Sequence, residues 1–129
     1  MPKQTLQLLN REFTVHSFPP ETEVPAAVLK SDVFFIGKTH DELSIVADSN
    51  LTLDSDEEES GWQALEVLGP LGFSLTGILS NISGVLAKAD ISIFAISTFD
   101  TDYILVKAEN VQLAMEKLTK DGYTVIKDS

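Results

Sequence analysis

The chain has 129 residues, of which 43% are hydrophobic and 22% are charged, and its formal net charge is −11. Such an apolar fraction excludes a disordered acidic tail, and the length suits one compact domain or two small packed halves. The negative charge argues against polyanionic partners, namely nucleic acids and anionic membrane surfaces.

Two absences narrow the class of protein further. The chain contains no Cys, which leaves no disulfide framework, thiolate metal site or Cys nucleophile. Its first residues lack the apolar core of a signal peptide, and no apolar run approaches the ~20 residues of a transmembrane helix. We therefore expect a soluble cytoplasmic protein that has no metal site and no cofactor.

The N-terminal part of the chain favours short strands over helices. Prolines at positions 19, 20 and 25 exclude a long helix there, so residues 26–30 form at most two turns. A tight turn at Asn10 is expected to join the first two strands, and the next two strands are expected to pair. These four predicted strands are residues 5–9, 11–18, 33–38 and 43–48.

An acidic run at residues 54–59 follows, in which five of the six side chains are Asp or Glu. Like charges repel one another and resist burial, so the run is expected to be a solvated loop. A cation site is the alternative, but a calcium loop needs a Gly-directed turn and spaced ligands, which this run lacks. We place the boundary between two halves, residues 1–60 and 61–129, beside this run.

The C-terminal half has a more regular pattern. Apolar residues at helical spacing from Ile78 to Ala89, and again from Val111 to Leu118, predict two amphipathic helices. Together with the strands, they give the order β-α-β-β-α-β. This order is typical of a ferredoxin-like α+β fold, a four-stranded antiparallel sheet with two helices on one face. The strands of this half are predicted at residues 62–68, 91–96, 103–107 and 123–127.

The two halves share a weak internal similarity. Residues 31–35 resemble residues 89–94, and residues 42–46 resemble residues 102–106. Because the order of the elements and the turn between the strands are kept, we interpret the similarity as a duplication. Chance similarity between short β-branched strands is the alternative interpretation.

Two segments of the C-terminal half combine features that suit ligand binding. Gly77 opens a helix whose first N–H groups lack intrahelical partners and favour a carboxylate or phosphate, although Thr76 at the cap position can satisfy one of them. Asp100 and Asp102 lie in the connection between two strands, where Asp and Thr commonly bond their own backbone. The alternative is that one of these carboxylates pairs with an ammonium group, giving a receptor for a zwitterion.

Residues 72–79 (GFSLTGIL) and 91–106 (ISIFAISTFDTDYILV) resemble the ACT domain, a small ferredoxin-like module that binds amino acids and regulates metabolic enzymes. More narrowly, they resemble stand-alone bacterial tandem-ACT proteins, which are similar to the ACT regions of aspartate kinases and of cytosolic arginine sensors. The likeness covers residues 33–107 well and the first 30 residues or so only by position.

The resemblance implies two ACT-like halves packed side by side, dimerisation that extends the sheets, and an amino-acid site at an interface between ACT units. The first half departs from the pattern because it lacks counterparts of the long first helix and of the Gly-Ile-Leu loop. Any regulatory output must pass to a separate partner protein. The ligand contacts that the resemblance implies are Thr76, Gly77, Ile78, Leu79, Ser97, Thr98, Asp100 and Asp102.

The sequence therefore favours a regulatory protein that binds an amino acid and has no catalytic activity of its own. A ligand-free ACT-fold scaffold or interaction protein is the alternative. An enzyme has little support, because His16 and His40 are the only histidines and neither has the spacing of a triad or a metal site. His16 lies in a predicted strand, where a packed or surface residue is expected.

Overall fold

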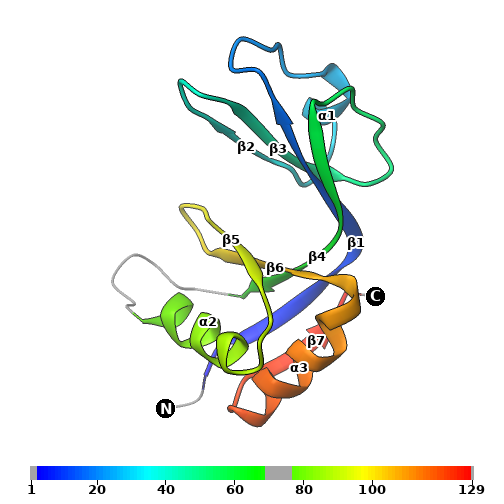
Figure 1. Ribbon diagram of the computed structural model, residues 1–129. Coiled ribbons are helices and arrows are strands. Elements are labelled where there is room, and N and C mark those ends of the chain that lie inside the picture. The colour runs from blue at the N-terminus through cyan, green and yellow to red at the C-terminus, as the bar shows by residue number, and fades with distance from the viewer. Residues whose placement is uncertain (1–2, 69–76, 129) are drawn as a thin grey trace. The chain divides into compact units, whose positions relative to one another are not determined.

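The computed structural model describes residues 3–68 and 77–128, which form an α+β fold (Figure 1). Its elements follow the predicted order closely, with one short 3-10 helix, η1, before the last α-helix. In chain order they are β1 (Thr5–Phe18), α1 (Ala26–Leu29), β2 (Phe35–Lys38), β3 (Leu43–Asp48), β4 (Glu57–Val67), α2 (Ile78–Lys88), β5 (Ile93–Ser97), β6 (Asp102–Lys107), η1 (Ala108–Asn110), α3 (Val111–Lys120) and β7 (Thr124–Lys127).

The chain divides into two compact units. One unit is continuous, from Arg11 to Trp62, and we call it the inserted unit. The other contains the described residues up to Asn10 and from Gln63 onward, and we call it the split unit. The long strands β1 and β4 each contribute one part to either unit.

The inserted unit has the strand order β2-β3-β1-β4. The pairing of β2 with β3 is antiparallel, from Phe35 opposite Val46 to Lys38 opposite Leu43, which confirms the expected hairpin. The only helix of this unit, α1, is four residues long and follows Pro25, as the prolines predict. Its small core consists of Phe18, Val28, Leu43, Ile45 and Ala47.

The split unit has the strand order β7-β1-β4-β6-β5, which corrects the expected four-stranded sheet. The start of β1 pairs in parallel with β7, from Thr5 opposite Thr124 to Leu8 opposite Lys127, and lies between β7 and β4. Leu6 is fully buried and Leu8 nearly so, both in the core of this unit. The β-α-β-β-α-β motif does not predict this fifth strand. The start of β1 comes from the other end of the chain, and no local sequence pattern indicates its pairing.

Both long helices of the split unit bury the faces that their apolar spacing predicts. Helix α2 buries Ile82 and Leu86, and helix α3 buries Val111, Ala114 and Leu118. All five belong to one cluster with residues of β1, β4 and β6, so the two helices cover the same face of the sheet. The expected helix pair on one sheet face is therefore confirmed.

The predicted turn at Asn10 is wrong, because β1 continues through it as a single strand of 14 residues. Buried positions alternate along β1 but change parity between Leu8 and Leu9, and again between Phe13 and Thr14. A change of parity means that the strand turns a different face to a core. In the sequence alone, the same change of parity looks like a break between two strands, which explains the wrong prediction.

The predicted loop at residues 54–59 is also partly wrong. Glu57 to Glu59 form the exposed start of β4. Within the inserted unit this part of β4 lies at the sheet edge, beside β1. An edge strand can keep charged side chains in water, and charge there discourages pairing with other chains. The run is therefore solvated, as predicted, although half of it is a strand.

Candidate functional site

The first candidate segment is the start of α2. Gly77 occupies the N-cap position with φ of +81°, a left-handed conformation that strains residues with a Cβ atom, and its carbonyl accepts the backbone N–H of Asn81 at 2.8 Å. Thr76, which we expected at the cap, lies outside the described residues. Ile78 and Leu79 are half-buried and pack against the core of the split unit, so their side chains have a structural role.

The second candidate segment is the hairpin between β5 and β6. Ser97 stands opposite Asp102 in the strand register, and its hydroxyl donates a hydrogen bond of 2.6 Å to Oδ1 of Asp102. At the turn, the backbone N–H of Thr98 donates to the carbonyl of Thr101 at 2.8 Å. Backbone bonding by turn residues, which the sequence allowed as the simpler interpretation, is thus present. Asp100 is exposed and Asp102 is half-buried.

Thr101 ties this hairpin to the strand that leads to the first segment. Its hydroxyl donates to the backbone carbonyl of Val67 at the end of β4. The chain continues from there towards Gly77 through residues 69–76, which lie outside the described part. Among the described residues, no hydrogen bond joins Gly77, Ile78 or Leu79 to the hairpin. The structure therefore brings the hairpin to the end of β4 and leaves the two candidate segments without a direct bond.

Sequence reasoning missed two residues of this hairpin. Thr101 is not among the predicted contacts, although it makes the bond to β4. Phe99 is 80% exposed, the most exposed of the large apolar side chains reported for the described residues. An exposed aromatic side chain beside Asp100 offers an apolar surface to a ligand or a partner. In the sequence, the sign that Phe99 would be exposed was its position in a turn and not in a periodic strand.

Negative charge surrounds Tyr103, the first β6 residue after Asp102. Burial raises the pKa of the Tyr103 phenol, and the charge of Glu66, a hydrogen bond with Glu66 and the charge of Asp100 raise it further. The phenol is therefore neutral at physiological pH. Two carboxylates near this strand, besides Asp102 itself, make the local field favourable for a cationic group.

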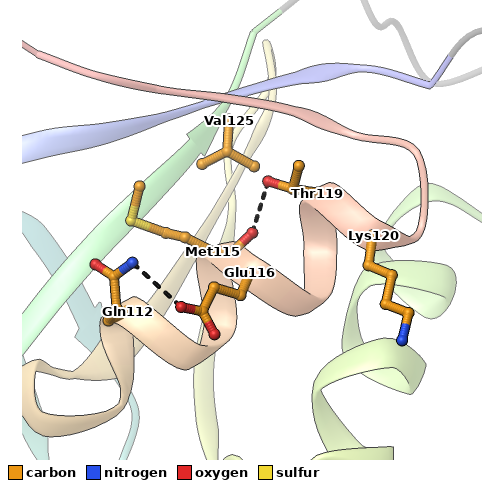
Figure 2. A pocket seen from close by; sticks show the side chains of 6 residues that line it. All are labelled: Gln112, Met115, Glu116, Thr119, Lys120 and Val125. Carbon is orange, nitrogen blue, oxygen red and sulfur yellow. Dashed lines mark hydrogen bonds between the residues drawn. The ribbon is translucent and has the colours of Figure 1, made fainter.

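A separate open groove of about 400 Å³ lies between α3 and β7 (Figure 2). Some of its polar groups bond within α3: Thr119 Oγ1 donates to the carbonyl of Met115 at 2.7 Å, and Gln112 Nε2 donates to Glu116 at 3.5 Å. It contains none of the predicted ligand contacts. The lining residues are Gln112, Met115, Glu116, Thr119, Lys120 and Val125.

The two histidines do not form a catalytic triad. His16 is buried as a packed residue, and its Nδ1 lies 2.9 Å from Ser55 Oγ and 4.0 Å from Glu58 Oε1. A triad places the hydroxyl and the carboxylate on different ring nitrogens, whereas here both face Nδ1. His40 is exposed and lies 3.5 Å from Asp41.

The described residues offer neither a metal-binding cluster nor a membrane-spanning helix. Residues 3–68 and 77–128 contain no group of three or more His, Asp or Glu side chains that could hold a metal ion. No helix in the same ranges has the length and apolar character needed to cross a membrane.

Residues 57–120 match the ACT domain family model. The human protein "Cytosolic arginine sensor for mTORC1 subunit 1" is 34% identical over 130 residues, which cover 93% of this chain and 39% of that protein. The chain thus spans well under half the length of this relative.

Solved structures extend the likeness over the whole fold. A crystal structure of an Agobacterium tumefaciens protein superposes with a TM-score of 0.91 at 28% identity, covering 100% of this chain and 96% of that one. The ligand-free regulatory subunit of aspartate kinase from Thermus thermophilus gives a TM-score of 0.57 at 10% identity, covering 93% and 95% of the two chains. At that identity the second match shows a shared fold alone.

Proposed function

Because residues 57–120 of this chain are an ACT domain, we propose that the protein binds an amino acid and regulates a separate protein, with no catalysis of its own. The observation that carries this proposal is the 34% identity, over 93% of the chain, with a protein named as an arginine sensor. The name of this relative describes a sensor, which supports a regulatory role over an enzymatic one.

The proposed site combines the start of α2 with the β5–β6 hairpin. The N–H groups at the start of α2 would bind the carboxylate of the amino acid, since the helix dipole favours an anion there. Asp102 would pair with the ammonium group. Ser97 occupies Oδ1 of Asp102, and Oδ2 accepts no hydrogen bond from the described residues, so this carboxylate keeps an acceptor for a ligand. Asp100 and Thr98 would line the same hairpin.

We propose further that the chain contains two ACT-like halves, residues 1–60 and 61–129. The strand orders of the two units support this proposal. The inserted unit has the order β2-β3-β1-β4, and the split unit, when β1 is omitted, has the corresponding order β5-β6-β4-β7. In the inserted unit, the first helix is reduced to α1, and residues 49–56 replace a second helix. A site that uses both halves equally is therefore not part of the proposal.

A homodimer is the assembly that we propose. Among the sheet edges, β2 carries Lys38, β7 carries Lys127 and β4 begins with three Glu, whereas β5 contains no charged residue. Two copies of β5 can pair without opposing like charges, even in a chain of net charge −11.

Ala95→Lys on β5 should convert the dimer to a monomer in sedimentation equilibrium. Ile126→Lys on β7 is the matched control, and a wild-type mass of one chain would contradict the dimer.

The direct test of function is a thermal-shift screen of the twenty common amino acids at millimolar concentration. A ligand at 100 times its Kd stabilises the folded state by about 2.7 kcal/mol, so binding should raise Tm by several degrees. Asp102→Asn should keep the fold and abolish the shift, while Asp128→Asn, on an exposed residue, should retain it. Binding that survives in Asp102→Asn would refute the role given to this carboxylate.

A ligand-free scaffold is the second candidate function. The Ser97–Asp102 and Thr98–Thr101 bonds favour it, since they account for these polar residues without a ligand. If no amino acid shifts Tm, this candidate replaces the first.

A further inference from the structure

The inserted unit contains a buried histidine that the proposed function does not use. His16 on β1 is 2% exposed. Its register partner on β3 is Ile45, and its ring stacks on Phe18 with 6.1 Å between ring centroids. Phe18 and Ile45 belong to the core of this unit, together with Val28 of α1. A titratable ring therefore lies among apolar side chains.

The two nitrogens of this ring have different surroundings. Nδ1 lies 2.9 Å from Ser55 Oγ, in the segment between β3 and β4. Nε2 is buried and has no hydrogen-bond partner among the described residues. A neutral imidazole carries one N–H, which is best placed on Nδ1, where it donates to Ser55, and Nε2 then keeps only a lone pair. The geometry thus selects the neutral ring with its proton on Nδ1.

Protonation would disturb this arrangement in two ways. It would add an N–H at Nε2, where no described residue accepts it, and it would place a charge in an apolar core. Of the groups around the ring, Phe18 of β1 and Ile45 of β3 are apolar, and the segment before β4 presents the Ser55 hydroxyl. The charged group that faces the ring is Glu58 of β4, 4.0 Å away and 56% exposed.

The balance of these effects favours the neutral ring. Burial lowers the pKa of His16 below its ordinary 6.5, and the opposing charge of Glu58 raises it by less. The folded state therefore resists protonation more than the unfolded chain does. Stability is unaffected at pH well above 6.5, and it is lost as pH falls below 6.5 towards the lower pKa of the folded state.

Residues 49–56, which we call the anchor segment, are attached to β1 at both ends. At one end Ser49 bonds to Thr14, at 2.8 Å between hydroxyl oxygens, and its backbone N–H donates to the Glu12 carbonyl at 2.9 Å. At the other end Ser55 bonds to His16, and the backbone N–H of Asp56 donates to the Ser17 carbonyl at 3.0 Å. Only the second attachment contains a group that titrates near neutral pH.

We propose that His16 is a pH-sensitive latch that holds the anchor segment, and with it the acidic start of β4, against β1. The neutral ring keeps the Ser55 end closed. A proton on the ring opens this end while the Ser49 end stays bonded. The latch thus links acidification to residues 54–59, which span the end of the anchor segment and the start of β4 and hold five of the chain's twenty acidic residues.

The first test measures hydrogen exchange of the Asp56 amide by NMR between pH 7.5 and 5.5, corrected for intrinsic exchange rates. Its protection should fall by up to about tenfold for each pH unit below 6.5, while the Leu51 amide, which donates to the carbonyl of Asp48 at the end of β3, should respond less. Protection of Asp56 that stays constant over this range would overturn the proposal.

Variants assign the effect to one side chain. His16→Phe keeps an aromatic ring beside Phe18 but cannot titrate, so Asp56 protection should become independent of pH. His40→Asn removes the chain's other histidine, which is exposed, and should leave the wild-type response intact. Glu58→Gln removes the charge that favours the protonated ring, so the loss of protection should still begin below pH 6.5 but continue to lower pH. A pH response that persists in His16→Phe contradicts the latch.

A second measurement does not depend on any variant folding. The imidazole nitrogens of the wild-type protein can be titrated by NMR. The proposal requires His16 to carry its proton on Nδ1 at pH 7 and to titrate below 6.5. A proton on Nε2, or a pKa of His16 at or above 6.5, would overturn it.

Discussion

The split unit and the inserted unit cover their hydrophobic cores in different ways. The split unit covers its sheet with two amphipathic helices of 11 and 10 residues, and its core is apolar apart from the hydroxyl of Tyr123. The inserted unit has one helix of four residues and buries two polar side chains, Thr14 and His16. Both of these bond to serines of the anchor segment. The comparison indicates that a segment without regular structure can close a small core when buried polar groups fix its ends.

The largest expected effect lies in the helices of the split unit. Leu86 of α2 is fully buried, so Leu86→Ala should lower the free energy of unfolding by about 2–5 kcal/mol, through lost burial and a cavity. Leu113 of α3 is 39% exposed, and Leu113→Ala is expected to cost less than about 1 kcal/mol. Urea denaturation measures both. Equal losses would mean that the helices do not carry the core of this unit.

A smaller effect is expected from two glycines, one at the N-cap of α2 and one inside it. Gly77→Ala forces a Cβ atom into a left-handed conformation at φ of +81° and should destabilise the protein by about 1 kcal/mol. Gly84 lies inside the helix with nothing within 4 Å of an added Cβ atom, so Gly84→Ala should stabilise by about 0.5–1 kcal/mol. Thermal unfolding should separate the two variants in sign. Stabilisation by Gly77→Ala would show that the residue tolerates a right-handed cap.

The smallest effect concerns an exposed carboxylate of the split unit. Asp121 accepts hydrogen bonds from Lys3 at 2.5 Å and from Asn81 at 3.2 Å, and these bonds lower its pKa below 3.8, with Lys3 the larger cause. The lowered pKa gives stability that is present above pH 3.8 and is lost as pH falls through the folded value. Lys3→Met should move the pKa of Asp121 back towards 3.8, measured by NMR of the carboxyl carbon.

The pH windows sharpen the comparison of the two units. Acid should weaken the inserted unit first, below pH 6.5, through His16, whereas the Asp121 contacts of the split unit persist until below pH 3.8. Hydrogen exchange resolved by residue can follow both units in one titration. Simultaneous loss of protection in both would contradict separate sensitivities.

The long helices and the β5–β6 hairpin could be predicted because their signals are local. Apolar residues three and four apart on α2 and α3 must lie on one helix face, whatever the rest of the chain does. The strands β5 and β6 are short, adjacent and apolar, which favours a hairpin. The turn bonds of Thr98 likewise follow from residue type and position.

The candidate site was less predictable than the fold. The sequence identified Asp102, but its bond to Ser97 depends on the register of β5 and β6, which places the two residues opposite each other. The link from Thr101 to Val67 depends on the order of strands in the sheet. Neither can be obtained from spacing along the chain, since each joins residues through a pairing that the tertiary fold decides.

Patterns among neighbouring residues were enough to predict the α+β class, the helix faces, the ACT resemblance and the solvation of the acidic run, because periodicity, composition and motif are local properties. Three features became evident in the folded chain alone: β1 is one strand, its start joins the split unit beside β7, and Glu57 to Glu59 form a strand. The same holds for the nitrogen of His16 that faces Ser55. Strand pairing and buried hydrogen bonds join residues far apart in the chain, and their energy is gained only when both partners are already in place.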